Sequence, residues 1–268
     1  MIFWVLCTVC ASIGLVIFSL QFGWWRASVS QVHPRVLMYH MINYPKKKAK
    51  FNKLRVSPRS FQKQVRYLKD NGYQFIFMSE LAESEENCVA LTFDDGYRDN
   101  LVYADKILEE VGGKATLYLV CDRHGRDWSV TKKAKHNSGE LRDEEKLSDN
   151  DVKTMLSNGR WELGAHTVTH AHLPSIHHAD LYREITRSKE ILEKTFDVNV
   201  KSFAYPFGIY SDRDVQAVRD AGFETACTTR EGISEKCTRD PLELSRVKVR
   251  GGESMLSFRL RLRTGRRK

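Results

Sequence analysis

Two adjacent carboxylates, Asp94 and Asp95, stand directly after the apolar run of residues 88–93. Two negative charges placed together at the end of a buried strand repel each other, so a cation or a bound proton is needed to offset the cost. Asp-Asp-Gly is also a frequent turn sequence, so the pair alone is weak evidence of function. We interpret the pair as a candidate cation site, with an ordinary turn as the alternative.

A second candidate group is the histidine pair His166 and His170, which follows the apolar run of residues 161–165. Histidines four residues apart meet on one side of a helical turn, a familiar spacing for metal ligands. Neutral imidazoles bind zinc and similar metals well, whereas two histidines satisfied by other contacts are the alternative. With Asp95 they would form a two-nitrogen, one-oxygen site that leaves a position open for water.

The third candidate is the segment Tyr205-Pro206-Phe207-Gly208. Proline and glycine around an aromatic residue predict a rigid loop at the end of a strand. A backbone N–H in such a loop could point at an oxyanion that develops during hydrolysis. An ordinary turn is the alternative when this motif is considered alone.

Short apolar runs and amphipathic helices alternate around these motifs, which is typical of a parallel α/β architecture. Polar residues follow each run, and in parallel α/β barrels the carboxyl ends of the strands carry the chemistry. Residues 122–148 are charged and poor in apolar positions, which indicates an insertion loop. The expected strands lie at residues 35–40, 88–93, 115–120, 161–165, 202–205, 224–228 and 242–249, and the expected helices at 57–72, 98–111, 149–157, 179–195 and 212–221.

The identity and order of the motifs resemble the polysaccharide deacetylase family, also called the NodB-homology or carbohydrate esterase 4 family. Residues 92–96 and 166–170 match its motifs strongly, and the resemblance spans residues 35–249. It implies a distorted (β/α)7 barrel, a TIM-like α/β fold, in a metal-dependent hydrolase that removes acetyl groups from an N-acetylated glycan. The implied ion is zinc, with cobalt or nickel as alternatives. An O-acetyl ester or lipid-linked sugar as substrate, or a non-catalytic glycan-binding module, are the remaining alternatives.

The resemblance also assigns roles to residues. Asp94 would be the general base, and Asp95, His166 and His170 would be the metal ligands. The ion would keep Asp94 ionised and make its bound water more acidic. The backbone N–H of Phe207 would stabilise the tetrahedral oxyanion together with the metal.

Two positions depart from the commonest pattern of the family. That pattern has an acid histidine near the C-terminal end, but no histidine follows His178. His40, after the first strand, instead resembles the acid of the poly-N-acetylglucosamine deacetylase branch, with a structural histidine as the alternative. Ala204 stands where many members carry an arginine that orients the catalytic carboxylate, and Arg246 is a candidate to supply that charge.

The first 25 residues carry no charged side chain, and residues 2–20 are almost wholly apolar, long enough to span a bilayer as a helix. Trp24 and Trp25 fit an aromatic belt at the interface. Signal peptides usually begin with basic residues, and no Lys or Arg precedes this apolar stretch, so we favour a retained single-pass anchor over a cleaved signal peptide. We therefore expect an anchor at residues 1–25, a linker at 26–34, a catalytic domain at 35–250 and a basic tail at 251–268. Basic residues after the span favour a catalytic domain in the cytoplasm. The family usually acts on glycans of the cell envelope, which favours the periplasm or the cell surface, and this is the location that we expect.

The formal net charge is +9, and residues 258–268 alternate basic and apolar side chains. This tail could hold an anionic lipid or an acidic polymer, with a solvated tail as the alternative. Nucleic acid is not expected as a partner because no base-reading module accompanies the charge. Cys227 and Cys237 are close enough in sequence to form a disulfide, and free thiols are the alternative.

Overall fold

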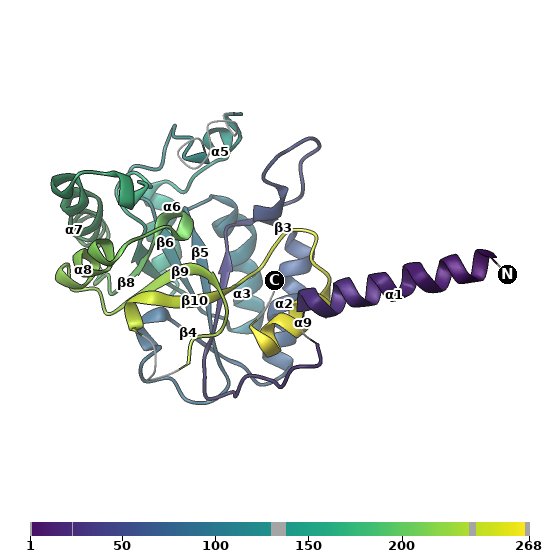
Figure 1. Cartoon of the computed structure of the whole chain (residues 1–268). Helices are drawn as coiled ribbons and strands as arrows, with labels where there is room; N and C mark the ends of the chain where they lie inside the picture. Colours follow the sequence, from purple (N-terminus) through teal and green to yellow (C-terminus); the bar gives the residue numbers. More distant parts are fainter. Residues whose placement is uncertain (1, 23, 130–137, 236–239, 266–268) are drawn as a thin grey trace.

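The computed structural model describes residues 2–22, 24–129, 138–235 and 240–265. Its centre is a parallel barrel, as the sequence predicted (Figure 1). Seven described strands close it, because β1 pairs with β10 on one side and with β5 on the other. In order around the barrel they are β1 (Arg35–Tyr39), β10 (Leu244–Lys248), β9 (Thr225–Glu231), β8 (Ser202–Ala204), β7 (Trp161–Ala165), β6 (Ala115–Leu119) and β5 (Cys88–Asp94).

Strands β1 and β5 are buried along their whole length, as the continuous apolar runs in their sequences predict for a parallel sheet. Their register places Tyr39 opposite Phe93, and the two rings stack at 5.3 Å between centroids. A short strand, β4 (Gln74–Ile76), pairs with the first half of β5 outside the closed ring. The remaining short elements are β2 (Met41–Ile42), β3 (Arg55–Val56), η1 (Asn52–Leu54), η2 (Met78–Glu80), η5 (Leu173–Ser175), η6 (Pro206–Gly208), η7 (Pro241–Glu243) and α5 (Glu140–Asp143).

Helices cover the outside of the barrel. In α2 (Pro58–Asp70), the Ser57 hydroxyl accepts the N–H of Ser60, and one face buries Phe61, Val65 and Leu68, as predicted. The other main helices are α6 (Asp149–Ser157), α7 (His178–Phe196) and α8 (Asp212–Asp220).

The single helix expected at residues 98–111 is two elements, a π-helix η3 (Asn100–Asp105) and then α3 (Lys106–Val111). The wider turns at its start place the Asn100 amide 2.9 Å from the backbone carbonyl of His40. Wide helical turns of this kind often occur next to functional sites.

The expected basic tail is instead a helix, α9 (Met255–Thr264), that packs against the barrel and α2. Phe258 is buried, and the buried guanidinium of Arg261 pairs with Glu231 at 2.7 Å and Glu253 at 2.5 Å. The prediction of a tail was wrong for residues 255–264, because the two carboxylates that neutralise Arg261 cannot be recognised from local sequence. Residues 266–268 lie outside the described residues.

At the other end of the chain, α1 (Ile2–Phe22) projects from the body of the molecule (Figure 1). By length and composition, Ile2–Leu20 can cross a membrane, and no part of that window is buried against the rest of the chain. A signal sequence has the same properties, so retention of this helix as an anchor stays a prediction.

The predicted disulfide between Cys227 and Cys237 can be followed at only one of the two residues. Cys227 is a free, buried thiol on β9, and the Tyr118 hydroxyl lies 3.4 Å from its sulfur. Its expected partner Cys237 lies outside the described residues.

Candidate active site

The two carboxylates occupy the end of β5 and the tight turn that follows it. Asp94 is the last residue of the strand, and Asp95 and Gly96 both adopt left-handed backbone angles, with φ of 79°. The N–H of Asp95 donates to the carbonyl of Tyr118 on the neighbouring strand at 3.1 Å. Asp95 is not glycine, so this conformation is strained, and such strain is concentrated at functional sites.

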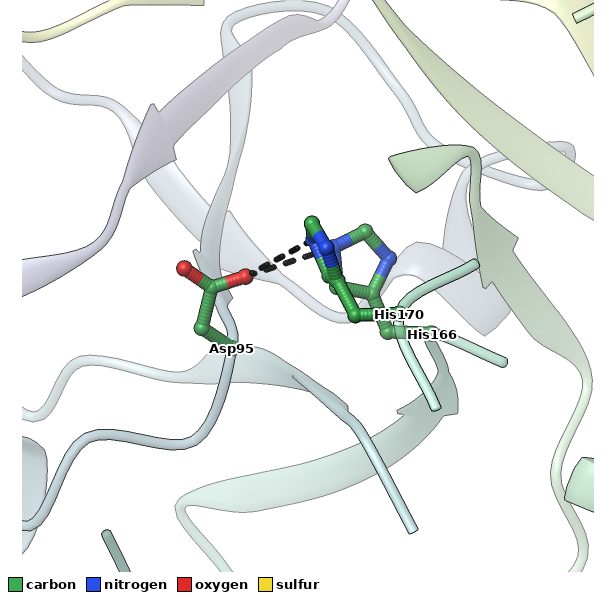
Figure 2. A group of neighbouring side chains, drawn as sticks. All are labelled: Asp95, His166 and His170. Atoms are coloured by element: carbon green, nitrogen blue, oxygen red, sulfur yellow. Dashed lines mark ion pairs between the residues drawn. The ribbon is translucent and has the colours of Figure 1, made fainter. Parts of the chain in front are cut away.

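The structure brings Asp95, His166 and His170 together at the carboxyl ends of β5 and β7. The Asp95 Oδ1 atom lies 3.5 Å from His166 Nε2 and 3.3 Å from His170 Nε2 (Figure 2). All three side chains are buried, and one ligand atom from each lies within 4.8 Å of the others. These are the three residues that the sequence predicted as a metal site.

The protonation states of this group suit a metal. The Nδ1 atom of His166 lies 2.6 Å from the carbonyl of Ala204, which can only accept, so Nδ1 carries a proton and Nε2 is the ring atom that faces Asp95. Burial lowers the pKa of His170 more than Asp95 raises it, which keeps that ring neutral. Burial would raise the pKa of Asp95, but the two histidine side chains against its carboxylate hold that pKa well below its usual range. Two imidazoles and one carboxylate are a ligand set that zinc accepts.

The histidines do not share a helical turn, and that part of the prediction was wrong. Residues 166–170 form a loop in which Thr167 and His170 have positive φ angles of 65° and 59°. The carboxylate of Glu184, buried on α7, accepts the N–H of Thr169 at 2.9 Å and its hydroxyl at 2.8 Å. Glu184 therefore holds the loop that carries both histidines. Sequence reasoning missed it, although an acid on the apolar face of an amphipathic helix is a signal that could have been used.

Arg246 lies against Asp94, where the sequence suggested that it could supply the missing charge. Its two terminal nitrogens each lie 2.7 Å from one Asp94 oxygen, and both side chains are buried. Further hydrogen bonds to the Thr92 hydroxyl at 3.0 Å and the Thr228 carbonyl at 2.9 Å fix the guanidinium. Burial would raise the pKa of Asp94, but the Arg246 charge outweighs it and lowers that pKa below its usual value. Asp94 is therefore ionised and rigidly oriented.

His40 follows β1 directly and is half-buried. In the register of β1 and β5, Tyr39 stands opposite Phe93, so His40 comes level with Asp94. His40 thus lies at the same end of the barrel as both carboxylates.

The third motif forms the loop η6 after β8. Phe207 has a positive φ of 60°, and its ring meets His170 edge-on at 4.5 Å between centroids. A Cβ atom at Gly208 would lie 2.0 Å from the Thr229 hydroxyl, so only glycine fits there. The Tyr205 side chain is buried and stacks on Tyr210 at 4.5 Å between centroids.

Sequence reasoning missed two residues of the segment that was interpreted as an insertion. The Trp128 ring stacks on His170 at 4.8 Å between centroids. The Lys146 ammonium lies over the rings of Trp128 and Tyr97, at 4.9 and 4.5 Å, and donates to two backbone carbonyls. Burial lowers the pKa of Lys146 to about 8. A tryptophan in an otherwise polar segment was the available signal.

Fold and site together define a parallel barrel with a buried cluster of carboxylates, histidines and an arginine at the carboxyl ends of its strands. The family model for polysaccharide deacetylases matches residues 82–226, more than half of the chain, and the chain belongs to that family. The match includes Asp94, Asp95, His166 and His170, whereas His40 and Arg246 lie outside it.

Among individual relatives, the chain is 28% identical over 230 residues to the putative polysaccharide deacetylase YxkH of Bacillus subtilis, covering 83% of this chain and 74% of the relative. It is 23% identical over 192 residues to the poly-β-1,6-N-acetyl-D-glucosamine N-deacetylase of Staphylococcus aureus, covering 66% of this chain and 61% of that protein.

Solved structures show the same fold. A putative polysaccharide deacetylase of Bacillus anthracis superimposes with a TM-score of 0.72 at 29% identity, covering 85% of this chain and 68% of that one. The Streptococcus pyogenes deacetylase PplD, solved with acetate, gives 0.72 at 26% identity over 85% of this chain and 97% of that one. IcaB of Ammonifex degensii gives 0.67 at 20% identity over 88% and 97% of the two chains, a likeness of fold alone.

Proposed function

We propose that this polysaccharide deacetylase hydrolyses the N-acetyl groups of an amino-sugar polymer, using a divalent ion held by Asp95, His166 and His170. Zinc is the ion that the ligand set favours, with cobalt or nickel as alternatives. The observation that carries the proposal is the buried ion pair of Asp94 and Arg246 directly beside the three candidate ligands. A rigid, ionised carboxylate next to a metal site is what a general base of this reaction requires.

Asp94 is the proposed base. Its two oxygens are held by Arg246, yet a carboxylate has about four acceptor positions, so it can still accept a proton from an attacking water. When bound, the ion polarises the acetyl carbonyl and makes water more acidic. The backbone N–H of Phe207 is proposed to donate to the oxyanion, and Tyr205 and Pro206 hold that loop in place.

His40 is the proposed acid. The acetyl C–N bond breaks only if the departing amine gains a proton, and a histidine beside both carboxylates can donate it. The products are acetate and a free amino group on the sugar.

The proposed substrate rests on the similarity of the chain to proteins with a described substrate. One relative is described as an N-deacetylase of poly-β-1,6-N-acetyl-D-glucosamine, which supports an N-acetylated glycan as the substrate class. We further propose that α1 is a retained single-pass anchor and that the barrel acts on the outer side of the membrane.

A comparison of acetylated substrates tests this assignment. The full chain in detergent, loaded with zinc, is given β-1,6-linked N-acetylglucosamine oligomers or O-acetylated xylan oligomers at equal acetyl concentration. The proposal expects faster acetate release from the N-acetyl substrate, with a free amine formed for each acetate. Release from the ester alone would replace the proposed amidase with an O-acetyl esterase.

A further inference from the structure

Helix α9 lies next to the C-terminal end of α1. The two helices are in contact, the Arg263 guanidinium donates to the carbonyl of Trp24, and the N–H of Val29 donates to the Arg263 carbonyl at 2.9 Å. Trp24 and Trp25 are exposed and stand just past the end of α1 at Phe22. Tryptophans at the end of a membrane span lie at the level of the lipid headgroups. If α1 spans a bilayer, Arg263 therefore lies at headgroup depth.

A groove opens at this point between α2, α9 and the linker. Its volume is about 350 Å³, and we call it the α9 groove; its polar lining includes Ser28, Tyr67, Asn71, Arg259 and Arg263. No acidic side chain is among the described residues that line it.

A buried arginine, Arg35, adds positive charge to the wall of the α9 groove. Its guanidinium donates to four backbone carbonyls and, among the described residues, to no carboxylate. The potential inside the groove is therefore positive.

The arginines of α9 divide into two kinds. Arg261 points inward to its two glutamates, whereas Arg259 and Arg263, four residues apart, share one face of the helix. Within the described part of the chain, neither of these two forms an ion pair with a carboxylate. Arg259 is exposed and stacks on the Tyr67 ring at 4.5 Å. Two guanidiniums with free N–H donors, side by side in a groove without acids, match a phosphate.

We propose that the α9 groove binds the phosphate of an anionic phospholipid in the membrane that α1 enters. Arg259 and Arg263 donate to the phosphate oxygens, and the Asn71 amide, which gives one N–H to the Tyr67 carbonyl at 2.8 Å, offers its second N–H. The α1 helix selects a lipid over a soluble anion, because it holds the groove in the headgroup layer, where lipid phosphate is concentrated. Such a contact would fix the tilt of the barrel relative to the membrane. A single helix joined to the barrel by a linker does not fix that tilt.

Native mass spectrometry of the full chain in detergent tests this site. Phosphatidylglycerol or phosphatidylcholine is titrated, and bound lipids are counted for the wild type, the double variant Arg259→Gln/Arg263→Gln and the control Arg183→Gln. Arg183 is exposed on α7, a helix that lies on the opposite side of the barrel from α9 (Figure 1). A basic residue near a membrane surface contributes about 1 kcal/mol, so each substitution should weaken phosphatidylglycerol binding about fivefold and the pair about 25-fold. The control should bind like the wild type.

Three results would overturn the proposal. They are equal binding of the two lipids by the wild type, unchanged phosphatidylglycerol binding by the folded double variant, or displacement of the lipid by millimolar inorganic phosphate or a soluble acidic polymer. Thermal unfolding of each variant verifies that it folds. Deacetylation of a soluble oligomer should be unchanged in the double variant, which separates this site from the proposed catalytic one.

Discussion

Replacing Arg246 by glutamine removes the one positive charge that forms a bidentate pair with Asp94, at 2.7 Å to each oxygen. The carboxylate is left almost fully buried, and losing an opposite charge at this range raises a carboxyl pKa by about 1–3 units. At about 1.4 kcal/mol per unit, the change corresponds to about 1.4–4 kcal/mol, similar to the 3–5 kcal/mol typical for breaking a buried ion pair.

The sign of the pH dependence follows from these shifts. In the wild type the pKa of Asp94 is below its ordinary value of 3.8, so the pair adds stability at neutral pH that is lost as pH falls through the lowered pKa. In Arg246→Gln burial alone raises the pKa, so the loss of stability is greatest near pH 7. It shrinks as pH falls through the raised pKa, because the buried carboxylate takes up a proton.

The assays are urea unfolding of the metal-free protein at several pH values and acetate release from N-acetylglucosamine oligomers by the zinc-loaded protein. We expect kcat to fall about 100-fold, because a general base usually contributes 10²–10⁴-fold. The acid limb of kcat/KM should move to higher pH, while zinc content stays unchanged. Arg230→Gln, which breaks a half-exposed pair with Glu243, is the matched control and should change stability by about 0–1 kcal/mol. Near-normal kcat in Arg246→Gln, or a stability loss that does not vary with pH, would refute the reasoning.

Three more substitutions separate the other roles. Asp95→Ala should abolish stoichiometric zinc binding, measured by elemental analysis after dialysis; retained zinc would exclude Asp95 as a ligand. His40→Gln should slow amide hydrolysis about 10²–10⁴-fold but hardly affect 4-nitrophenyl acetate, whose leaving group needs no proton; an equal loss on both would contradict an acid role. Glu184→Gln should weaken zinc affinity about 10-fold, because Thr169 and the histidine loop lose their support, and a chelator competition that shows no change would disprove it.

The barrel and the cluster of Asp94, Asp95, His166 and His170 were predictable from sequence because their signals are local. Apolar runs define buried strands, and the carboxyl ends of all the parallel strands lie at the same end of the barrel. The pairing of Arg246 with Asp94 was only suggested, because it depends on register across three strands. Leu37 of β1 stands opposite Leu91 on one side and Val247 on the other, and no local pattern specifies that alignment.

The features that the sequence did not predict also depend on contacts between residues that only the fold brings together. Trp128 and Lys146 come from a segment whose polarity indicates a loop, and only tertiary packing shows that they cover the site. Helix α9 was predicted as a basic tail because the partners of Arg261, Glu231 and Glu253, are brought to it only by the fold. The histidine loop was mistaken for a helical turn because four-residue spacing is also produced by a loop with positive φ angles.

The central claim is that Asp94 acts as a base beside a metal held by its neighbours. Its most direct test is acetate release from N-acetylglucosamine oligomers by wild type and Asp94→Asn, each with measured zinc content and with a chelator control. The account predicts chelator-sensitive release by the wild type, and an Asp94→Asn protein that keeps its zinc but loses turnover by at least about 100-fold. Near-normal release by zinc-loaded Asp94→Asn, or release by the wild type that a chelator does not affect, would contradict it.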